Sequence, residues 1–257
     1  MDIKIEGEYL LTDTEGIVLR QIKTSYNRRM VLLFSRKYGK ISAGTNIGEK
    51  GKSKSSLALR PFTYGRYELF KGRDNYNINS AEVLKSYYKI GEDVDKYMNG
   101  AYVLEFTEKV LSEEVPSAGI FNLLTDFFDI LENRDKGIGT LVLAYQTKLL
   151  KYSGVMPQLE KCAICGENKE AVKFSIEDGG IVCGDCLQNI QNSQRHALIY
   201  DVKFGIVDIL RYFTANSLKN LENLALKEDA GKLLQKIIRE YAAYYLDASD
   251  LKNEKLI

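Results

Sequence analysis

The sequence has no long apolar run, a single histidine and only four cysteines among its 257 residues. No stretch approaches the roughly 18 consecutive apolar residues that a membrane-spanning helix needs. Residues 1–6 also lack the apolar run of a secretory signal, so we expect a cytoplasmic protein. The 45% content of hydrophobic residues is nevertheless enough for a buried core, which excludes a generally disordered chain.

Residues that commonly carry catalysis are few, and their sequence context is unfavourable. The sole histidine, His196, has no nucleophile or acidic cluster near it in the sequence. Gly51-Lys52-Ser53 resembles the end of a phosphate-binding loop, but that motif requires a glycine five positions earlier, where the chain has Asn46. We therefore predict that the chain is not an enzyme.

The formal net charge of +1 conceals a strongly uneven distribution along the chain. Residues 20–73 contain fourteen Lys and Arg but only two acidic residues, which gives this window a net charge of +12. The remainder contains 22 basic and 33 acidic residues, a net charge of −11. Such asymmetry indicates a strongly negative partner, with a merely solvated basic face as the alternative.

The first part of the chain is rich in β-forming residues and shows no helical period. The expected strands are residues 16–19, 30–34, 41–43, 62–70 and 76–78. Five short strands of this kind predict a small barrel. Between the third and fourth strands, residues 44–56 are rich in Gly, Lys and Ser, and we expect a mobile, positively charged loop there.

The pattern changes near residue 80, where Asn79-Ser80-Ala81-Glu82-Val83 is typical of a capped helix start. Apolar residues then recur at helical spacing within 103–110, 121–131, 141–152, 202–213 and 233–245. Pro116 and the pair Gly137 and Gly139 separate these segments. The sequence therefore predicts an α+β protein with a barrel domain at 1–79 and a helical domain at 80–257.

All four cysteines fall in two pairs with the pattern C-x2-C-x17-C-x2-C. They are Cys162, Cys165, Cys183 and Cys186. This spacing is typical of a structural zinc site with four thiolate ligands, so we predict one Zn²⁺ in a module at 160–190. The alternatives are two disulfides, a redox-active pair and an iron–sulfur cluster.

The residues around the cysteines support a hairpin that brings the two pairs together. Residues 172–176 alternate like a strand, Asp178-Gly179-Gly180 forms a turn, and 181–182 continue as a second strand. Gly166 and Gly184 permit the tight turns that aim backbone N–H groups at the thiolates.

The basic window also carries aromatic residues, a combination that suits nucleic-acid strands. Cations follow the phosphates, and aromatic faces stack on bases without reading their sequence. The candidate DNA-binding residues are Arg20, Arg28, Arg29, Lys37, Tyr38, Lys40, Lys50, Lys52, Lys54, Arg60, Tyr64 and Arg66. Tyr67 is a further stacking candidate. Partial burial in the barrel is an equal alternative for each tyrosine, and simple solvation is the alternative for each single cation.

Several ordered fragments resemble the bacterial DNA repair protein RecO family over nearly the whole chain. They are EGIVL at 15–19, YGKISA at 38–43, LRPFTYG at 59–65, AYVLE at 101–105, FNLL at 121–124, LLKYSG at 149–154 and LEKCAICG at 159–166. The order and spacing of the fragments make the resemblance specific, although each fragment alone is weak.

This resemblance implies an N-terminal OB-fold, a C-terminal helical domain and, in the zinc-bearing branch, the four-cysteine module. It also implies a bacterial, nucleoid-associated recombination mediator that binds single- and double-stranded DNA and anneals complementary strands. The implied partners are RecR, the acidic tail of single-strand-binding protein and, indirectly, RecA. The alternative is a zinc-ribbon adaptor or transcription-associated module whose DNA affinity is incidental.

Overall fold

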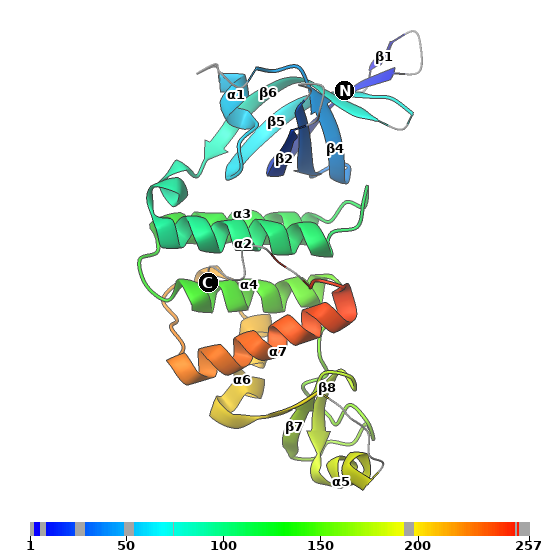
Figure 1. The fold of residues 1–257 in the computed structure, drawn as a ribbon, viewed down its shortest axis with the longest axis vertical. Coiled ribbons are helices and arrows are strands. Elements are labelled where there is room, and N and C mark those ends of the chain that lie inside the picture. The colour runs from blue at the N-terminus through cyan, green and yellow to red at the C-terminus, as the bar shows by residue number, and fades with distance from the viewer. Residues whose placement is uncertain are drawn as a thin grey trace. The chain divides into compact units, whose positions relative to one another are not determined.

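The computed structural model describes residues 3–5, 9–23, 29–48, 54–73, 75–192, 198–249 and 251. Its elements fall into two compact units, one running to Glu132 and the other beginning at Asn133 (Figure 1). Each unit is described here by itself. In the described parts of the chain, no helix combines the length and apolar composition needed to cross a membrane.

The first unit begins with a closed β-barrel. Its strands are β2 (Tyr9–Lys23), β3 (Arg29–Ser35), β4 (Gly39–Thr45), β5 (Thr63–Lys71) and β6 (Tyr76–Ser86). The strands are hydrogen-bonded in the order β2-β3-β4-β6-β5, and β5 pairs again with β2 to close the ring. Only β4 and β6 run parallel among these pairs. This is the strand order of an OB-fold, so the predicted five-stranded barrel is confirmed. A short strand β1 (Ile3–Ile5) pairs with the start of β2.

The barrel strands form where the sequence alternates between apolar and polar residues. In β4 and in most of β5, every second residue is buried, as expected when one face of a strand points into the barrel. The barrel interior is filled by side chains that include Val31, Leu33 and Tyr67. The last five residues of β3 are all buried, because Phe34 on its other face packs against Phe121 of α3 with ring centroids 5.3 Å apart.

One expectation about this unit was wrong, and the bounds of another were too wide. Residues 79–83 do not begin a helix: they lie in the middle of β6, which pairs with β5 from Tyr76 to Ser86. The cross-strand hydrogen bonds of this long ladder override the local capping pattern. In the expected loop at 44–56, residues 44–45 still belong to β4 and the short helix α1 (Lys54–Ala58) follows, while 49–53 lie outside the described residues.

Helices complete the first unit and make up most of the second. The first unit adds the 3-10 helix η1 (Tyr88–Glu92), α2 (Val94–Val110) and α3 (Ala118–Asn133). The second contains α4 (Ile138–Tyr152), η2 (Lys203–Gly205), α6 (Ile206–Ala215), η3 (Lys219–Leu221) and α7 (Glu228–Leu246). The expected helical segments are therefore confirmed. Pro116 lies between α2 and α3 and Gly137 precedes α4, but Gly139 lies inside α4, so its expected role as a separator was wrong.

A small β structure follows α4 within the second unit. It consists of β7 (Ala171–Ser175), β8 (Gly180–Cys183), α5 (Gly184–Asn192) and β9 (Ile199–Asp201). β7 and β8 form the predicted antiparallel hairpin, and β9 adds a third strand on the other side of β7, which the sequence did not reveal. We call these elements, with the turn at 162–166, the four-cysteine module.

Candidate nucleic-acid interface and metal centre

The hairpin brings the two cysteine pairs together. The Sγ atoms of the four cysteines all lie within 4.8 Å of one another, and those of Cys165 and Cys183 are 4.0 Å apart. A tetrahedral ZnS₄ site with Zn–S bonds of about 2.3 Å has sulfur–sulfur distances of about 3.8 Å. All four cysteines are free thiols, so the structure contains no disulfide among them. The donor set and its size therefore fit one metal ion.

Local backbone geometry explains how each pair faces the same point. Gly166 adopts the left-handed conformation with φ 73° and donates its N–H to the carbonyl of Cys162, which closes the first turn. Gly184 does not form the expected tight turn. It is the first residue of α5, and its φ is not positive. Cys183 therefore precedes the helix and Cys186 lies in its first turn, where the helix dipole favours negative charge.

The acidities of the thiols show what the cluster requires. Burial raises the pKa of the Cys162 thiol, but hydrogen bonds from the backbone of Cys165, Cys183 and Ile164 outweigh it and lower the pKa to about 6. Burial raises the pKa of Cys186 to about 12, and contacts with the neighbouring thiols act in the same direction. Four thiolates this close together repel one another, so full ionisation requires a cation among them. This charge requirement agrees with the metal fit.

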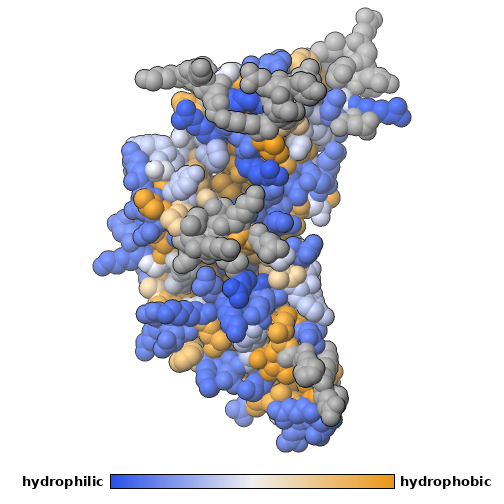
Figure 2. All heavy atoms as spheres, viewed as in Figure 1, coloured by the Kyte–Doolittle hydropathy of each residue, from blue (hydrophilic) through white to orange (hydrophobic). Residues whose placement is uncertain are grey.

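Around the cysteines the module has little core. The buried cluster there consists of Val182, Ile190 and three of the cysteines, while Phe174 of the hairpin is buried against Tyr241 of α7. Apolar residues gather over the module's surface (Figure 2), and Ile164, Val172 and Leu198 leave more than a third of their surface exposed. A metal ion is thus the most effective cross-link available to this part of the chain.

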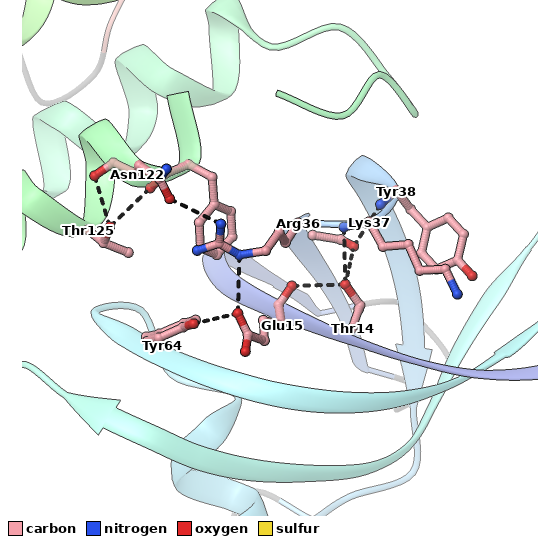
Figure 3. A network of polar contacts seen from close by, with 10 residues as sticks. Thr14, Glu15, Arg36, Lys37, Tyr38, Tyr64, Asn122 and Thr125 are labelled. Atoms are coloured by element: carbon pink, nitrogen blue, oxygen red, sulfur yellow. Dashed lines mark hydrogen bonds and ion pairs between the residues drawn. The ribbon is translucent and has the colours of Figure 1, made fainter. Parts of the chain in front are cut away.

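In the first unit, the predicted DNA contact Tyr64 belongs to a network of polar contacts within the chain. Figure 3 shows Arg36 between the barrel and α3, where its Nε lies 3.1 Å from Glu15 Oε2 and its Nη1 donates to Asn122 Oδ1 at 3.1 Å. Tyr64 donates to the same Glu15 at 2.5 Å, and its ring contacts that of Phe121. Burial, followed by this hydrogen bond, raises the pKa of Tyr64. Tyr64 therefore holds the barrel against α3.

Arg20 and Lys40 also bind acidic or carbonyl groups of the chain. The Arg20 Nε donates to both carboxylate oxygens of Glu108 in α2 at 2.8 Å. The Lys40 side chain is only 13% exposed: its Nζ lies 3.2 Å from Glu113 Oε1 and donates to the carbonyl of Glu108 at 3.0 Å. These contacts attach the barrel to α2 and to residues 111–117, the linker that joins α2 to α3.

A neighbouring glycine shows how closely that linker approaches. Gly39, with φ 70°, lies so near the linker that an added Cβ would come within 2.4 Å of the Val115 carbonyl oxygen. The β3–β4 turn is therefore built around a backbone contact that only glycine permits.

Beyond this contact, cations and aromatic rings form a cluster at the β3–β4 turn. Lys37 is exposed and donates to Thr12 Oγ1 at 2.9 Å, with its Nζ 5.3 Å from the Tyr38 ring centroid. The rings of Tyr38 and Tyr76 are 5.6 Å apart, and the Lys71 Nζ lies 4.8 Å from the first and 5.4 Å from the second. We call Lys37, Tyr38, Lys71 and Tyr76 the turn cluster. Figure 3 shows Lys37 and Tyr38 pointing away from the Arg36 network.

The other predicted residues lie elsewhere or are not described. Arg29 begins β3 and Arg60 precedes β5, so both lie at the end of the barrel opposite the turn cluster. Arg66 is exposed on β5, and its Nη1 lies 4.0 Å from Glu82 Oε2. Tyr67 is fully buried and donates to the Ala58 carbonyl, so its expected stacking role was wrong. Lys54 begins α1, but its side chain is not described. Arg28, Lys50, Lys52 and His196 lie outside the described residues.

Sequence reasoning missed Lys71 and Tyr76 as site residues. The sequence marks Tyr76 only as part of a strand and Lys71 only as one of the basic residues in the window. The available signal was topological: β5 ends and β6 begins beside the β3–β4 turn once β4 and β6 pair in parallel.

Comparison with known proteins gives one consistent family. The family model described as Recombination protein O N terminal matches residues 10–87, and that described as Recombination protein O C terminal matches residues 91–255. The chain is 30% identical to the DNA repair protein RecO of Alkaliphilus metalliredigens over 242 residues, 93% of this chain and 95% of that protein. It is also 30% identical to RecO of Listeria monocytogenes over 245 residues, 95% of this chain and 92% of that protein.

Proposed function

The chain belongs to the RecO family of recombination proteins, and from this premise we propose that it is a DNA-binding recombination mediator in DNA repair. It binds single- and double-stranded DNA and anneals complementary strands without hydrolysing a nucleotide. With RecR it helps to load RecA onto DNA coated by single-strand-binding protein, whose acidic tail it also binds. The observation that carries this proposal is the OB-fold barrel with its turn cluster, in a chain that matches both domains of the family.

The turn cluster supplies the two kinds of group that strand binding needs. Lys37 and Lys71 carry positive charge that neutralises phosphates, which releases counterions and makes binding weaken with salt. Tyr38 presents an aromatic ring beside those cations. Tyr76 is buried, and its ring supports that of Tyr38. Arg20, Lys40 and Tyr64 are left out of this interface because each binds a carboxylate of the chain: Glu108, Glu113 and Glu15 respectively.

The four cysteines are proposed to hold one structural Zn²⁺. When bound, the ion neutralises the thiolates and cross-links the turn at 162–166 to the start of α5. Four thiolate ligands leave no open coordination position for a substrate, so this centre has no proposed catalytic role.

Salt-dependent binding to single-stranded DNA tests the interface. The double variant Lys37→Glu with Lys71→Glu should weaken binding of an oligothymidylate, and each lost phosphate contact should reduce the slope of log K against log salt by about 0.7. The matched control reverses two exposed lysines of the second unit, Lys219→Glu with Lys227→Glu, and should leave the slope unchanged. Binding that is absent or insensitive to salt in the unaltered protein would contradict the proposal.

Strand annealing separates a mediator from a zinc-ribbon adaptor. The unaltered protein should anneal complementary strands that are already coated by single-strand-binding protein, and RecR should then permit RecA loading. An adaptor with incidental DNA affinity would act on naked strands at most. Failure on coated DNA, with and without RecR, would therefore favour the adaptor.

A further inference from the structure

A pocket of about 570 Å³ opens at the end of the barrel opposite the turn cluster. Its walls come from the starts of β3 and β5, from α1, and from the segment that joins β6 to α2. A strand rises about 3.4 Å per residue, so the seven residues of β3 separate the two sites by roughly 20 Å. The volume lies within the range of about 300–1,000 Å³ that is usual for ligand pockets.

The charge of the pocket has one sign. Arg29 and Arg60 line it, and none of its described lining residues is acidic. The Arg29 guanidinium donates to the Gln21 side chain at 2.9 Å and to the Ile47 carbonyl at 3.1 Å, so its partners are neutral and its charge is not compensated by them. Arg60 is exposed and forms no ion pair with a described residue. The pocket therefore suits an anionic ligand.

Two exposed aromatic rings line the same pocket as these cations. Tyr88 in η1 is 62% exposed and Tyr97 in α2 is 51% exposed, and both line the pocket. Large aromatic side chains are normally buried in a barrel or helix core, and in this unit many are. Bases of single-stranded nucleic acids stack on solvent-exposed aromatic rings, and arginine in the same site adds to the binding.

One residue that lines the pocket, Phe62, has an unusual backbone conformation. Phe62 has φ 60°, which is strained for a residue with a bulky side chain. Its ring is fixed against Tyr97 and Phe128, each 5.6 Å away, and its carbonyl accepts the Tyr87 N–H at 3.1 Å. Gly100 makes room for it, because an added Cβ would lie 2.8 Å from the Phe62 ring. Arg60, Phe62 and Tyr97 all line the pocket, so the fixed Phe62 ring forms a well-held part of its wall.

We propose that this pocket receives an unpaired nucleotide of a single-stranded DNA, with its base on Tyr88 and Tyr97 and its phosphate on Arg60 and Arg29. The proposal rests on the proposed function and adds a second contact point to the turn cluster. A duplex keeps its bases stacked and paired, so the pocket gives the barrel a means of preferring unpaired strands. An acidic peptide would use the arginines but would leave both exposed rings without a role.

Substitution of the exposed residues tests the assignment in the full-length protein. Tyr88→Ala should weaken binding of a single-stranded oligothymidylate about 5-fold or more, the effect of losing one base–aromatic stack, while Tyr88→Phe should keep it. Arg60→Ala should weaken the same binding and lower its salt slope by about 0.7. Binding of a duplex of equal length should not change with Tyr88→Ala. A 5-iododeoxyuridine oligonucleotide should photocrosslink to Tyr88 or Tyr97.

Matched controls outside the pocket are Tyr152→Ala, a tyrosine 54% exposed in α4, and Lys227→Ala, an exposed cation before α7. Neither should alter single-strand binding. If the unaltered protein binds oligothymidylate but Tyr88→Ala and Arg60→Ala bind it equally well, the pocket assignment is wrong and the proposed function stands. If the unaltered protein does not bind it, the proposed function itself fails. Binding of a polyglutamate peptide that is lost in Arg60→Ala, with DNA binding unchanged, would assign the pocket to a protein partner instead.

Discussion

The barrel and the four-cysteine module are both small β structures, but different interactions hold them together. The barrel closes on itself because β5 pairs with both β2 and β6, so these strands leave no long open edge. The barrel interior is filled by apolar side chains of its own strands, whereas in the module Phe174 packs against Tyr241 of α7 and the buried cluster at the other end contains three cysteines. The module is an open three-stranded sheet. A closed ladder and an apolar core stabilise the first, whereas the second is an open sheet to which the proposed metal would add a cross-link.

The same contrast applies to the positive charges of the barrel. Arg20 and Lys40 bind carboxylates or carbonyls of the segment 108–113, and Arg36 binds Glu15. Lys37 and Lys71 lie instead beside aromatic rings, and Arg60 lines a pocket. A basic window in the sequence thus contains two populations: cations that attach the barrel to its helices and cations that lie beside aromatic rings or line a pocket.

The largest effect is expected from removing the metal. Zinc contributes on the order of 10 kcal/mol to small domains of this kind, so a strong chelator or Cys162→Ser should unfold the module. Hydrogen exchange should become fast at 171–183 and stay slow in the barrel strands, and metal analysis should fall from about one zinc per chain. Slow exchange in the metal-free module would show that its core suffices without the ion.

A smaller effect should follow from a cavity in the barrel core. Leu33 is fully buried there, and Leu33→Ala should lower the free energy of unfolding by about 3 kcal/mol. Denaturant unfolding followed by circular dichroism measures this loss. The zinc content should not change, because the two regions are stabilised by different interactions. Loss of zinc in this variant would contradict that separation.

The smallest effect is expected at the exposed ion pair between the barrel and α2. The Arg20 side chain is half exposed, so solvent screens its interaction with Glu108. Arg20→Gln should cost less than about 1 kcal/mol of unfolding free energy. A double-mutant cycle with Glu108→Gln gives the coupling, and Arg20→Gln should leave single-stranded DNA binding within error of the unaltered protein. A large loss of DNA binding would return Arg20 to the interface.

Much of the fold could be predicted because the relevant signals are local. The alternation in β4 and β5, the helical spacing of α3 and α7, and the spacing of the cysteines each arise within one segment. The error at residues 79–83 has the opposite origin. Asn79 and Ser80 do resemble a helix cap, but the register with β5 supplies hydrogen bonds that a local pattern cannot show.

For the candidate site, the sequence predicted only which residue types occur together, not which of them face a ligand. The sequence placed cations and tyrosines in one window, but Tyr67 faces the core and Tyr64 binds Glu15, 49 residues away. Phe62 and Tyr88 gave no signal, because the pocket exists only where the end of β6 meets the start of β5.

The sequence by itself determined the classes of structure: a basic β region, a series of helices and a four-thiolate site whose ligand spacing admits few other uses. Tertiary structure decided which members of each class act. Arg20 and Glu108 are 88 residues apart in the chain, and whether an arginine pairs within the protein or stays available to DNA depends on such distant contacts. The charge on a residue is a property of its side chain, but its availability depends on the side chains that the fold places around it.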